Sequence, residues 1–120
     1  MSYKIAVAST DGKVVNQHFG RADQFYIIEV DDEGEYEAIE LRKLPPICQG
    51  GDHDEDAMIR NVKLLSDCEF VLVSRIGHSA ENALERQGIV TYVIPDIIED
   101  AVIKLISYEK ISKMIDDIAR

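Results

Sequence analysis

Short apolar runs alternate with polar, turn-forming stretches along the chain, and their order predicts the secondary structure. The first third favours three successive strands, and the remainder favours strands that alternate with helices. The expected strands are residues 3–8, 24–30, 35–44, 69–74 and 89–94. Apolar residues at helical spacing predict helices after residue 53, from residue 79 to 87, and from residue 97 onward.

Capping residues mark the ends of the predicted helices. Asp52, followed three residues later by Glu55, matches the pattern of a capping box before the first helix. Ser79 is the expected N-cap of the second helix, and Gly88 is its expected C-terminal stop. The acidic loop residues are expected to cap and to face solvent rather than bind a hard cation: Asp11, Asp52, Asp54 and Glu55.

The order of the elements predicts an α/β fold with a mixed sheet covered by helices. Consecutive strands in the first half would pair antiparallel, and strands joined by helices would run parallel. The resulting strand order is 3-2-1-4-5, with only the second strand reversed. In this arrangement the loops 9–23, 45–53 and 75–79 meet at one edge, where open α/β sheets usually bind ligands.

Composition narrows the range of functions. The chain has 120 residues, enough for one domain, and 46% of them are hydrophobic. Acidic residues outnumber basic ones by 23 to 13, and the net charge of −10 disfavours nucleic acids and anionic membranes as partners. The start does not resemble a signal peptide, no apolar run reaches membrane length, and there are two cysteines. We therefore expect a cytoplasmic protein.

All three histidines and one cysteine fall on the loops that are expected to converge. Cys48 and His53 are five positions apart, with two glycines between them. A thiolate and an imidazole on such a loop could bind iron, zinc or an iron–sulfur species, or could simply face solvent. His18 precedes an aromatic residue and a glycine, and is either a ligand on a tight turn or a packed loop histidine.

The same edge carries positive charge. His78 stands just before an expected helix start, where anions are favoured, and Arg21 and Arg75 lie on the neighbouring loops. A simple capping turn is the alternative interpretation of His78. Cys68 begins an apolar strand and is expected to be a small buried hydrophobic residue rather than a ligand.

The sequence favours binding over catalysis. It contains no phosphate-loop motif, no dinucleotide-binding glycine pattern, no HExxH and no CxxC pair. The serines that follow strands lack the setting of a nucleophile elbow. We therefore predict no catalytic residue.

Two segments resemble the dinitrogenase iron–molybdenum cofactor biosynthesis family, which includes NifX, NafY and the C-terminal part of NifB. The first segment joins the strand at residues 5–9 to His18-Phe19-Gly20-Arg21-Ala22 and the strand at residues 25–28. The second is a strand that ends in a glycine turn at residues 71–77, followed by a helix and a Gly-Ile-x-x-Tyr strand at residues 83–92. The resemblance covers residues 3–106, so we predict a domain of residues 1–106 and a helical extension, residues 107–120, packed on the same domain.

The resemblance implies a ribonuclease H-like, three-layer α/β fold with helices on both faces of the sheet and no nuclease activity. It also implies a carrier or chaperone that transiently binds an iron–sulfur or iron–molybdenum cofactor precursor during nitrogenase cofactor assembly. Such a carrier would exchange its cargo with assembly or acceptor proteins. His18 corresponds to the family's HFG histidine, and Cys48 and His53 fall in a loop where cluster-binding members carry ligands. His78 stands where the family usually has a proline.

These observations combine into one hypothesis and two alternatives. The metal ligands would be Cys48, His18 and His53, with His78 as a further candidate. Arg21, Arg75 and backbone N–H groups near residue 79 would offset the negative charge of the cargo. The first alternative is a cofactor-free interaction module that acts through the C-terminal helix, whose apolar positions predict packing on the domain or on a second copy. The second is a zinc hydrolase that uses the same three ligands.

Overall fold

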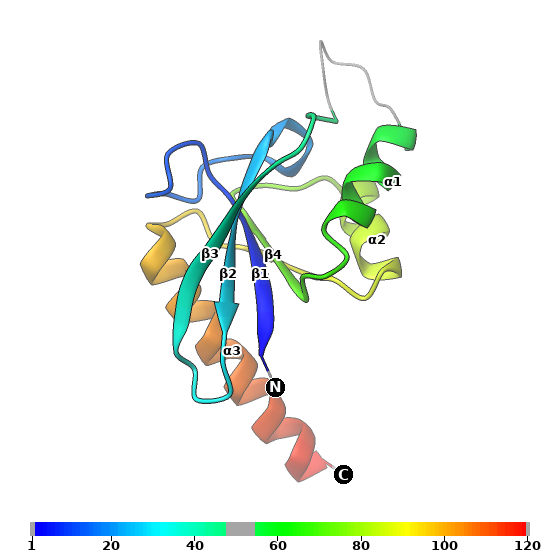
Figure 1. Ribbon diagram of the computed structural model, residues 1–120. Coiled ribbons are helices and arrows are strands. Elements are labelled where there is room, and N and C mark those ends of the chain that lie inside the picture. Colours follow the sequence, from blue (N-terminus) through cyan, green and yellow to red (C-terminus); the bar gives the residue numbers. More distant parts are fainter. Residues whose placement is uncertain (1, 48–54, 120) are drawn as a thin grey trace.

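The computed structural model describes residues 2–47 and 55–119 (Figure 1). The strands are β1 (Tyr3–Ala8), β2 (Gln24–Val30), β3 (Tyr36–Lys43), β4 (Phe70–Val73) and β5 (Val90–Val93). The helices are the short 3₁₀ helix η1 (Phe19–Arg21) and the α-helices α1 (Glu55–Leu64), α2 (His78–Arg86) and α3 (Ile98–Ala119).

The five strands form one mixed sheet in the order β3-β2-β1-β4-β5. β2 runs antiparallel to both of its neighbours, β1 and β3, whereas β4 is parallel to β1 and β5 is parallel to β4. The predicted strand order, with only the second strand reversed, is therefore confirmed. Its physical basis is that α1 and α2 carry the chain back across the sheet between parallel strands.

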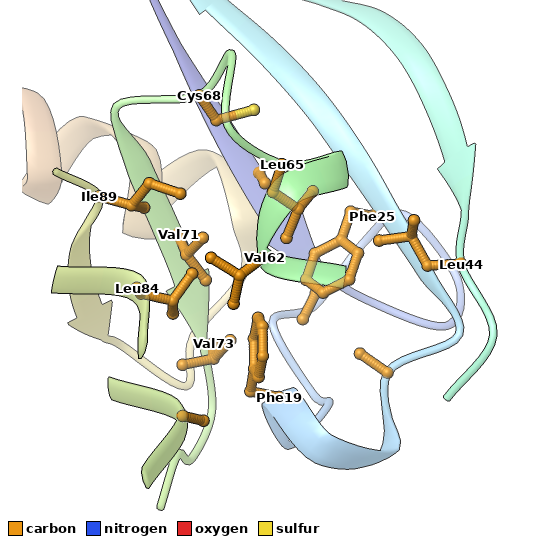
Figure 2. Close-up of a cluster of buried hydrophobic side chains, with 14 of the residues drawn as sticks. Phe19, Phe25, Leu44, Val62, Leu65, Cys68, Val71, Val73, Leu84 and Ile89 are labelled. Carbon is orange, nitrogen blue, oxygen red and sulfur yellow. The ribbon is translucent and has the colours of Figure 1, made fainter. Parts of the chain in front are cut away.

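Helices cover both faces of the sheet. Alternate residues of a strand point to opposite faces, so Ala6 and Ala8 of β1 face α1 and α2, whereas Ile5 and Val7 face α3. Figure 2 shows the first of these two cores, in which Val62 of α1, Leu84 of α2 and Leu65, just after α1, meet the strand side chains Phe25, Val71 and Val73. The second core is closed by four residues of α3: Ala101, Val102, Leu105 and Ile106.

The start of α2 differs from the prediction. Gly77, rather than Ser79, is the N-cap, and the helix begins at His78. The backbone of Gly77 is extended, and its carbonyl oxygen accepts the first helical hydrogen bond, from Glu81 N at 3.0 Å. An N-cap needs this backbone geometry even when it has no side chain, so the polar side chain of Ser79 misled the prediction. The predicted stop at Gly88 is confirmed by its positive φ of 77°.

β3 is more exposed than its partly alternating pattern predicts. The pattern predicts a strand with one face exposed to solvent and one face covered. In the structure, however, seven of its eight residues are exposed, including Ile39 and Leu41. β3 is the edge strand next to β2, and the register between the two shifts between Ile27 and Ile28. Arg42 is the half-buried exception, because its guanidinium donates to Leu64 O at the end of α1.

α3 continues without a break through the predicted boundary between residues 106 and 107. Just past that boundary, the ring of Tyr108 stacks on Tyr92, and Glu109 accepts a 2.8 Å hydrogen bond from the Tyr92 hydroxyl. The apolar side chains further along are more than half exposed: Ile111, Met114, Ile115 and Ile118. Within the described parts of the chain, neither α3 nor any other helix combines the length and apolarity needed to cross a membrane.

Candidate functional site

A groove of about 550 Å³ lies at the edge where β1 and β4 end. Its walls come from η1, from the turn after β4 and from the first turn of α2, with Ile47 and Met58 completing it. The prediction that three loops meet at this edge is confirmed for the described residues 18–21, 47 and 75–79. The groove therefore lies where the order of the parallel strands switches, between β1 and β4.

Backbone hydrogen bonds attach the segment around η1 to the end of β4. Ser74 N donates to Gln17 O at 3.1 Å, and Phe19 N donates to Arg75 O at 3.0 Å. His18 and Arg75 thereby form an isolated parallel bridge. This bridge extends the sheet by one residue pair and brings the side chains of both residues to the groove.

Backbone hydrogen bonds also hold the other side of η1 in place. Ile47 N donates to Gly20 O at 3.1 Å, and Leu44 N donates to Asp23 O at 3.0 Å. The side chain of Phe19 is only 1% exposed and lies 5.9 Å from the Phe25 ring. Phe19 therefore anchors η1 in the core shown in Figure 2, between the exposed side chains of its neighbours His18 and Arg21.

The structure brings four of the six predicted site residues to this one groove. His18, Arg21, Arg75 and His78 are exposed and line it. Cys48 and His53 lie outside the described residues, so His18 is the one described member of the predicted metal-ligand set. Within residues 2–47 and 55–119, no three His, Cys, Asp or Glu side chains gather as a metal site.

The groove offers positive charge on an acidic protein. Across the described residues, neither Arg21 nor Arg75 has a carboxylate oxygen within ion-pair distance. Gly77 supplies no capping side chain, and among the described residues no side chain caps the N–H groups in the first turn of α2 at the groove. The acidic residue of that turn, Glu81, does not line the groove. A helix N-terminus of this kind attracts anions.

Most of the remaining lining of the groove is apolar, which sequence reasoning missed. Ile47, Met58, Ile76 and Ala80 line it beside the charged residues. Met58 packs against the core while also reaching the groove. The sequence did contain one signal for this apolar lining, because Ile76 lies between the predicted site residues Arg75 and His78. An apolar groove with a cationic, imidazole-bearing rim suits a compact anion that has a polarisable surface.

Two other candidates have structural roles, as predicted. Cys68 is 2% exposed, and burial raises the pKa of its thiol to about 12, so this cysteine remains a neutral packed side chain. The Asp11 carboxylate accepts hydrogen bonds from Lys13 N at 2.8 Å and Val14 N at 3.2 Å. Asp11 therefore shapes the turn after β1.

The family model described as "Dinitrogenase iron-molybdenum cofactor" matches residues 1–108. This chain belongs to that family. The resemblance drawn from the two sequence segments is thus confirmed.

Two curated relatives named as FeMo cofactor biosynthesis proteins share more than a third of the aligned residues with this chain. NifB of Frankia alni, named a FeMo cofactor biosynthesis protein, is 41% identical over 104 residues, which are 84% of this chain and 20% of that protein. NifB of Azotobacter vinelandii, named likewise, is 36% identical over 88 residues, 71% of this chain and 17% of that protein. The chain spans about a fifth of the length of these relatives.

Solved structures share the fold. The apo form of the orange protein from Desulfovibrio gigas matches with a TM-score of 0.58 and 22% identity, covering 88% of each chain. The protein PH0822 matches with a TM-score of 0.67 and 22% identity, covering 87% of this chain and 90% of that one. At these identities the likeness speaks for the architecture alone.

Proposed function

We propose that this chain is a non-catalytic carrier of an iron–sulfur or iron–molybdenum type cofactor precursor, which it binds in the groove and passes to an assembly or acceptor protein. The observation that supports this most is the meeting of His18, Arg21, Arg75 and His78 around one partly apolar groove. We also assign the three-layer architecture to the ribonuclease H-like type, without nuclease activity.

Membership of this family indicates which class of cofactor the chain would carry. The relatives that match this chain are named FeMo cofactor biosynthesis proteins. Metal–sulfide clusters of this kind are compact, anionic and covered by polarisable sulfur. A groove that combines two exposed guanidinium groups with apolar walls suits such a cluster, because the charges attract the anion and the apolar side chains pack against its sulfur atoms.

Each part of the groove has a role in this proposal. Arg21 and Arg75 offset the charge of the cargo, together with the N–H groups at the start of α2. Neutral imidazoles of His18 and His78 can bind iron atoms at the cluster surface. Cys48, next in sequence to the groove residue Ile47, is expected to add a thiolate ligand, and His53 a further imidazole.

Release of the cargo is as important to a carrier as binding. The two arginines and two histidines of the groove are exposed side chains, unlike the ligands of a buried four-cysteine cage that would retain its cluster. Exchange of one or two ligands with an acceptor would therefore free the cargo without unfolding the domain.

The test is an anaerobic titration with isolated iron–molybdenum cofactor and, separately, with a soluble iron–sulfur cluster, followed by gel filtration. We expect the visible chromophore to migrate with the wild-type chain. Arg75→Gln and Cys48→Ala should weaken retention about tenfold or more, because each removes a strong polar contact to the cargo.

Arg86→Gln is the matched control. Arg86 is an exposed arginine at the C-terminal end of α2, outside the groove, and its substitution changes the net charge equally. Retention by wild type and Arg86→Gln, but not by Arg75→Gln, supports the carrier. The carrier proposal is contradicted if all variants retain the cofactor equally, or if the wild-type chain retains none. Either outcome favours the interaction module, whose binding surface would be the exposed apolar part of α3.

A further inference from the structure

Asn61 is a polar side chain buried within the apolar face of α1. It is 2% exposed, and among the described residues Ser9 is the other buried polar side chain. Two residues on the same face of the helix, Ala57 and Val62, are buried and apolar. A buried amide destabilises a fold unless its polar atoms are hydrogen-bonded. The partners of Asn61 therefore indicate what an amide contributes at this position.

Both polar atoms of the Asn61 amide have a partner. The nitrogen Nδ2 donates to Pro45 O at 2.7 Å, and the oxygen Oδ1 accepts from Arg60 Nε at 3.1 Å. The first of these hydrogen bonds crosses from α1 to residues 44–47, which follow β3. Asn61 thus links two segments that are sixteen residues apart in the sequence.

The segment of residues 44–47 depends on such links, because it has few backbone donors. Pro45 and Pro46 have no N–H group and cannot continue the ladder of the sheet. The N–H groups of Leu44 and Ile47 donate to carbonyl oxygens in and just after η1. The Pro45 carbonyl binds Asn61 on α1. The segment is thereby attached both to η1 and to α1.

The link joins two parts of the apolar wall of the groove. Ile47 lies two residues after Pro45, and Met58 lies three residues, or about one helical turn, before Asn61 on α1. Both Ile47 and Met58 line the groove. A hydrogen bond is directional, so it fixes the relative position of the two segments more closely than an apolar contact would.

We propose that Asn61 is a positioning residue of the groove, which holds Ile47 and Met58 where they can pack against a sulfur-covered cluster. This inference rests on the carrier function proposed above. Asn61 does not itself line the groove, so its effect on the cargo passes through the apolar wall. A gap of about 0.5–1 Å between packed atoms removes roughly a quarter to a half of their dispersion attraction. A small displacement of the wall therefore weakens retention of the cargo.

Two substitutions remove the donor to Pro45. Asn61→Asp keeps the shape of the side chain and the oxygen near Arg60, but sets a carboxylate oxygen against Pro45 O. Asn61→Ala removes the amide altogether, and it serves as the test if the buried carboxylate prevents folding. Each should weaken retention of isolated iron–molybdenum cofactor in anaerobic gel filtration about threefold to tenfold, at a temperature where circular dichroism shows the variant folded.

Val102→Ala is the control for a general loss of stability. Val102 is fully buried in the second core, on the opposite face of the sheet from α1. Its truncation destabilises the domain without touching the groove, so retention by the folded variant should equal that of wild type.

A double-mutant cycle tests whether Asn61 acts through the apolar wall. Ile47→Ala should itself weaken retention, and adding Asn61→Asp should then cause a smaller loss than it causes in wild type, because part of the wall is already missing. Combined with Arg75→Gln, Asn61→Asp should keep its full effect, since Arg75 lies on the turn after β4 and not on this wall.

Amide hydrogen exchange tests the positioning separately from the carrier function. In both Asn61 variants the Ile47 N–H should exchange about tenfold faster, and by a larger factor than the N–H groups of β4, because the segment opens locally. Val102→Ala should not favour Ile47 in this way. If wild type retains no cofactor, the carrier function fails, while the exchange rates still decide whether Asn61 holds the wall.

Three results overturn the positioning role. The first is retention by both Asn61 variants equal to that of wild type. The second is full additivity of Asn61→Asp with Ile47→Ala, which would mean that Asn61 acts independently of the wall. The third is an increase in exchange at Ile47 that is no larger than the increase in β4, which would show a loss of global stability alone.

Discussion

Phe19 donates its backbone N–H to the carbonyl oxygen of Arg75 at 3.0 Å, across more than fifty residues of sequence. This contact joins η1 to the turn between β4 and α2. Phe19 itself is buried, so its exposed neighbours His18 and Arg21 are held beside Arg75 at the groove. The candidate site is therefore assembled by the end of the sheet rather than by any one loop.

One substitution can add a capping side chain at the N-terminus of α2. Gly77 has an extended backbone, and a Cβ added there would meet no atom within 4 Å. Gly77→Asp should therefore place a capping carboxylate over the free N–H groups, with stability unchanged or raised by a few tenths of a kcal/mol. The same carboxylate occupies the anion site, so cofactor retention in gel filtration should fall about tenfold.

Gly77→Ala separates charge from bulk at this position. Alanine adds the Cβ without the carboxylate, so retention should stay close to wild type. If Gly77→Asp retained the cargo as well as Gly77→Ala does, the start of α2 would not be part of the binding site.

Phe19 should be the groove residue that matters most for folding. It is 1% exposed and packs against Phe25, so Phe19→Ala should lower the free energy of unfolding by about 3–5 kcal/mol, measured by urea denaturation. Ile59→Ala, at an exposed site, should change it by less than about 0.5 kcal/mol. A loss below about 1 kcal/mol for Phe19→Ala would show that η1 is not anchored through this ring.

The ion pair between Arg42 and Asp67 should contribute to the loss of stability at acidic pH. The Arg42 guanidinium donates to both Asp67 carboxylate oxygens, at 2.8 and 3.0 Å, and holds the pKa of that carboxyl well below its usual range. The stabilisation is complete above the unfolded pKa of about 3.9, and it is lost as the pH falls from there toward the folded pKa. Asp67→Asn should lower stability near pH 7 by about 1 kcal/mol, a small value because the Asp67 side chain is 44% exposed.

Thermal unfolding between pH 2 and 7 provides the measurement. The curve for Asp67→Asn should be flatter than that for wild type below about pH 4, since one linked carboxyl is gone. Glu85→Gln, at an exposed site on α2, should follow the wild-type slope. If the stability of wild type and of Asp67→Asn fell identically at acidic pH, this ion pair would not contribute to stability.

Cys68 should be inert in the folded protein. Its thiol is buried and has a pKa raised to about 12, so little reactive thiolate forms at neutral pH. Alkylation followed by peptide mass spectrometry should modify Cys68 only when denaturant is added. Rapid labelling of Cys68 under native conditions would contradict its placement in the core.

The strands and their order were predictable because the signals for them are local. A buried strand such as β4 appears as an unbroken apolar run, and helical crossovers require its parallel neighbours. The start of α2 was mispredicted because backbone geometry at Gly77, not a side chain, forms the cap. The exposure of β3 was mispredicted because its residue pattern does not show that this edge strand contributes no residue to either buried core.

The sequence by itself determined the five strands, the family, and four residues that line the groove, since each of these depends on residue type or on patterns within a few positions. Only the tertiary structure decided that Ile47 and Met58 complete an apolar wall beside Arg75, and that Ile111 and Ile115 of α3 stay exposed. Both outcomes depend on contacts between segments far apart in the chain, or on where α3 passes the end of the sheet. Such relationships leave no periodic mark in the sequence.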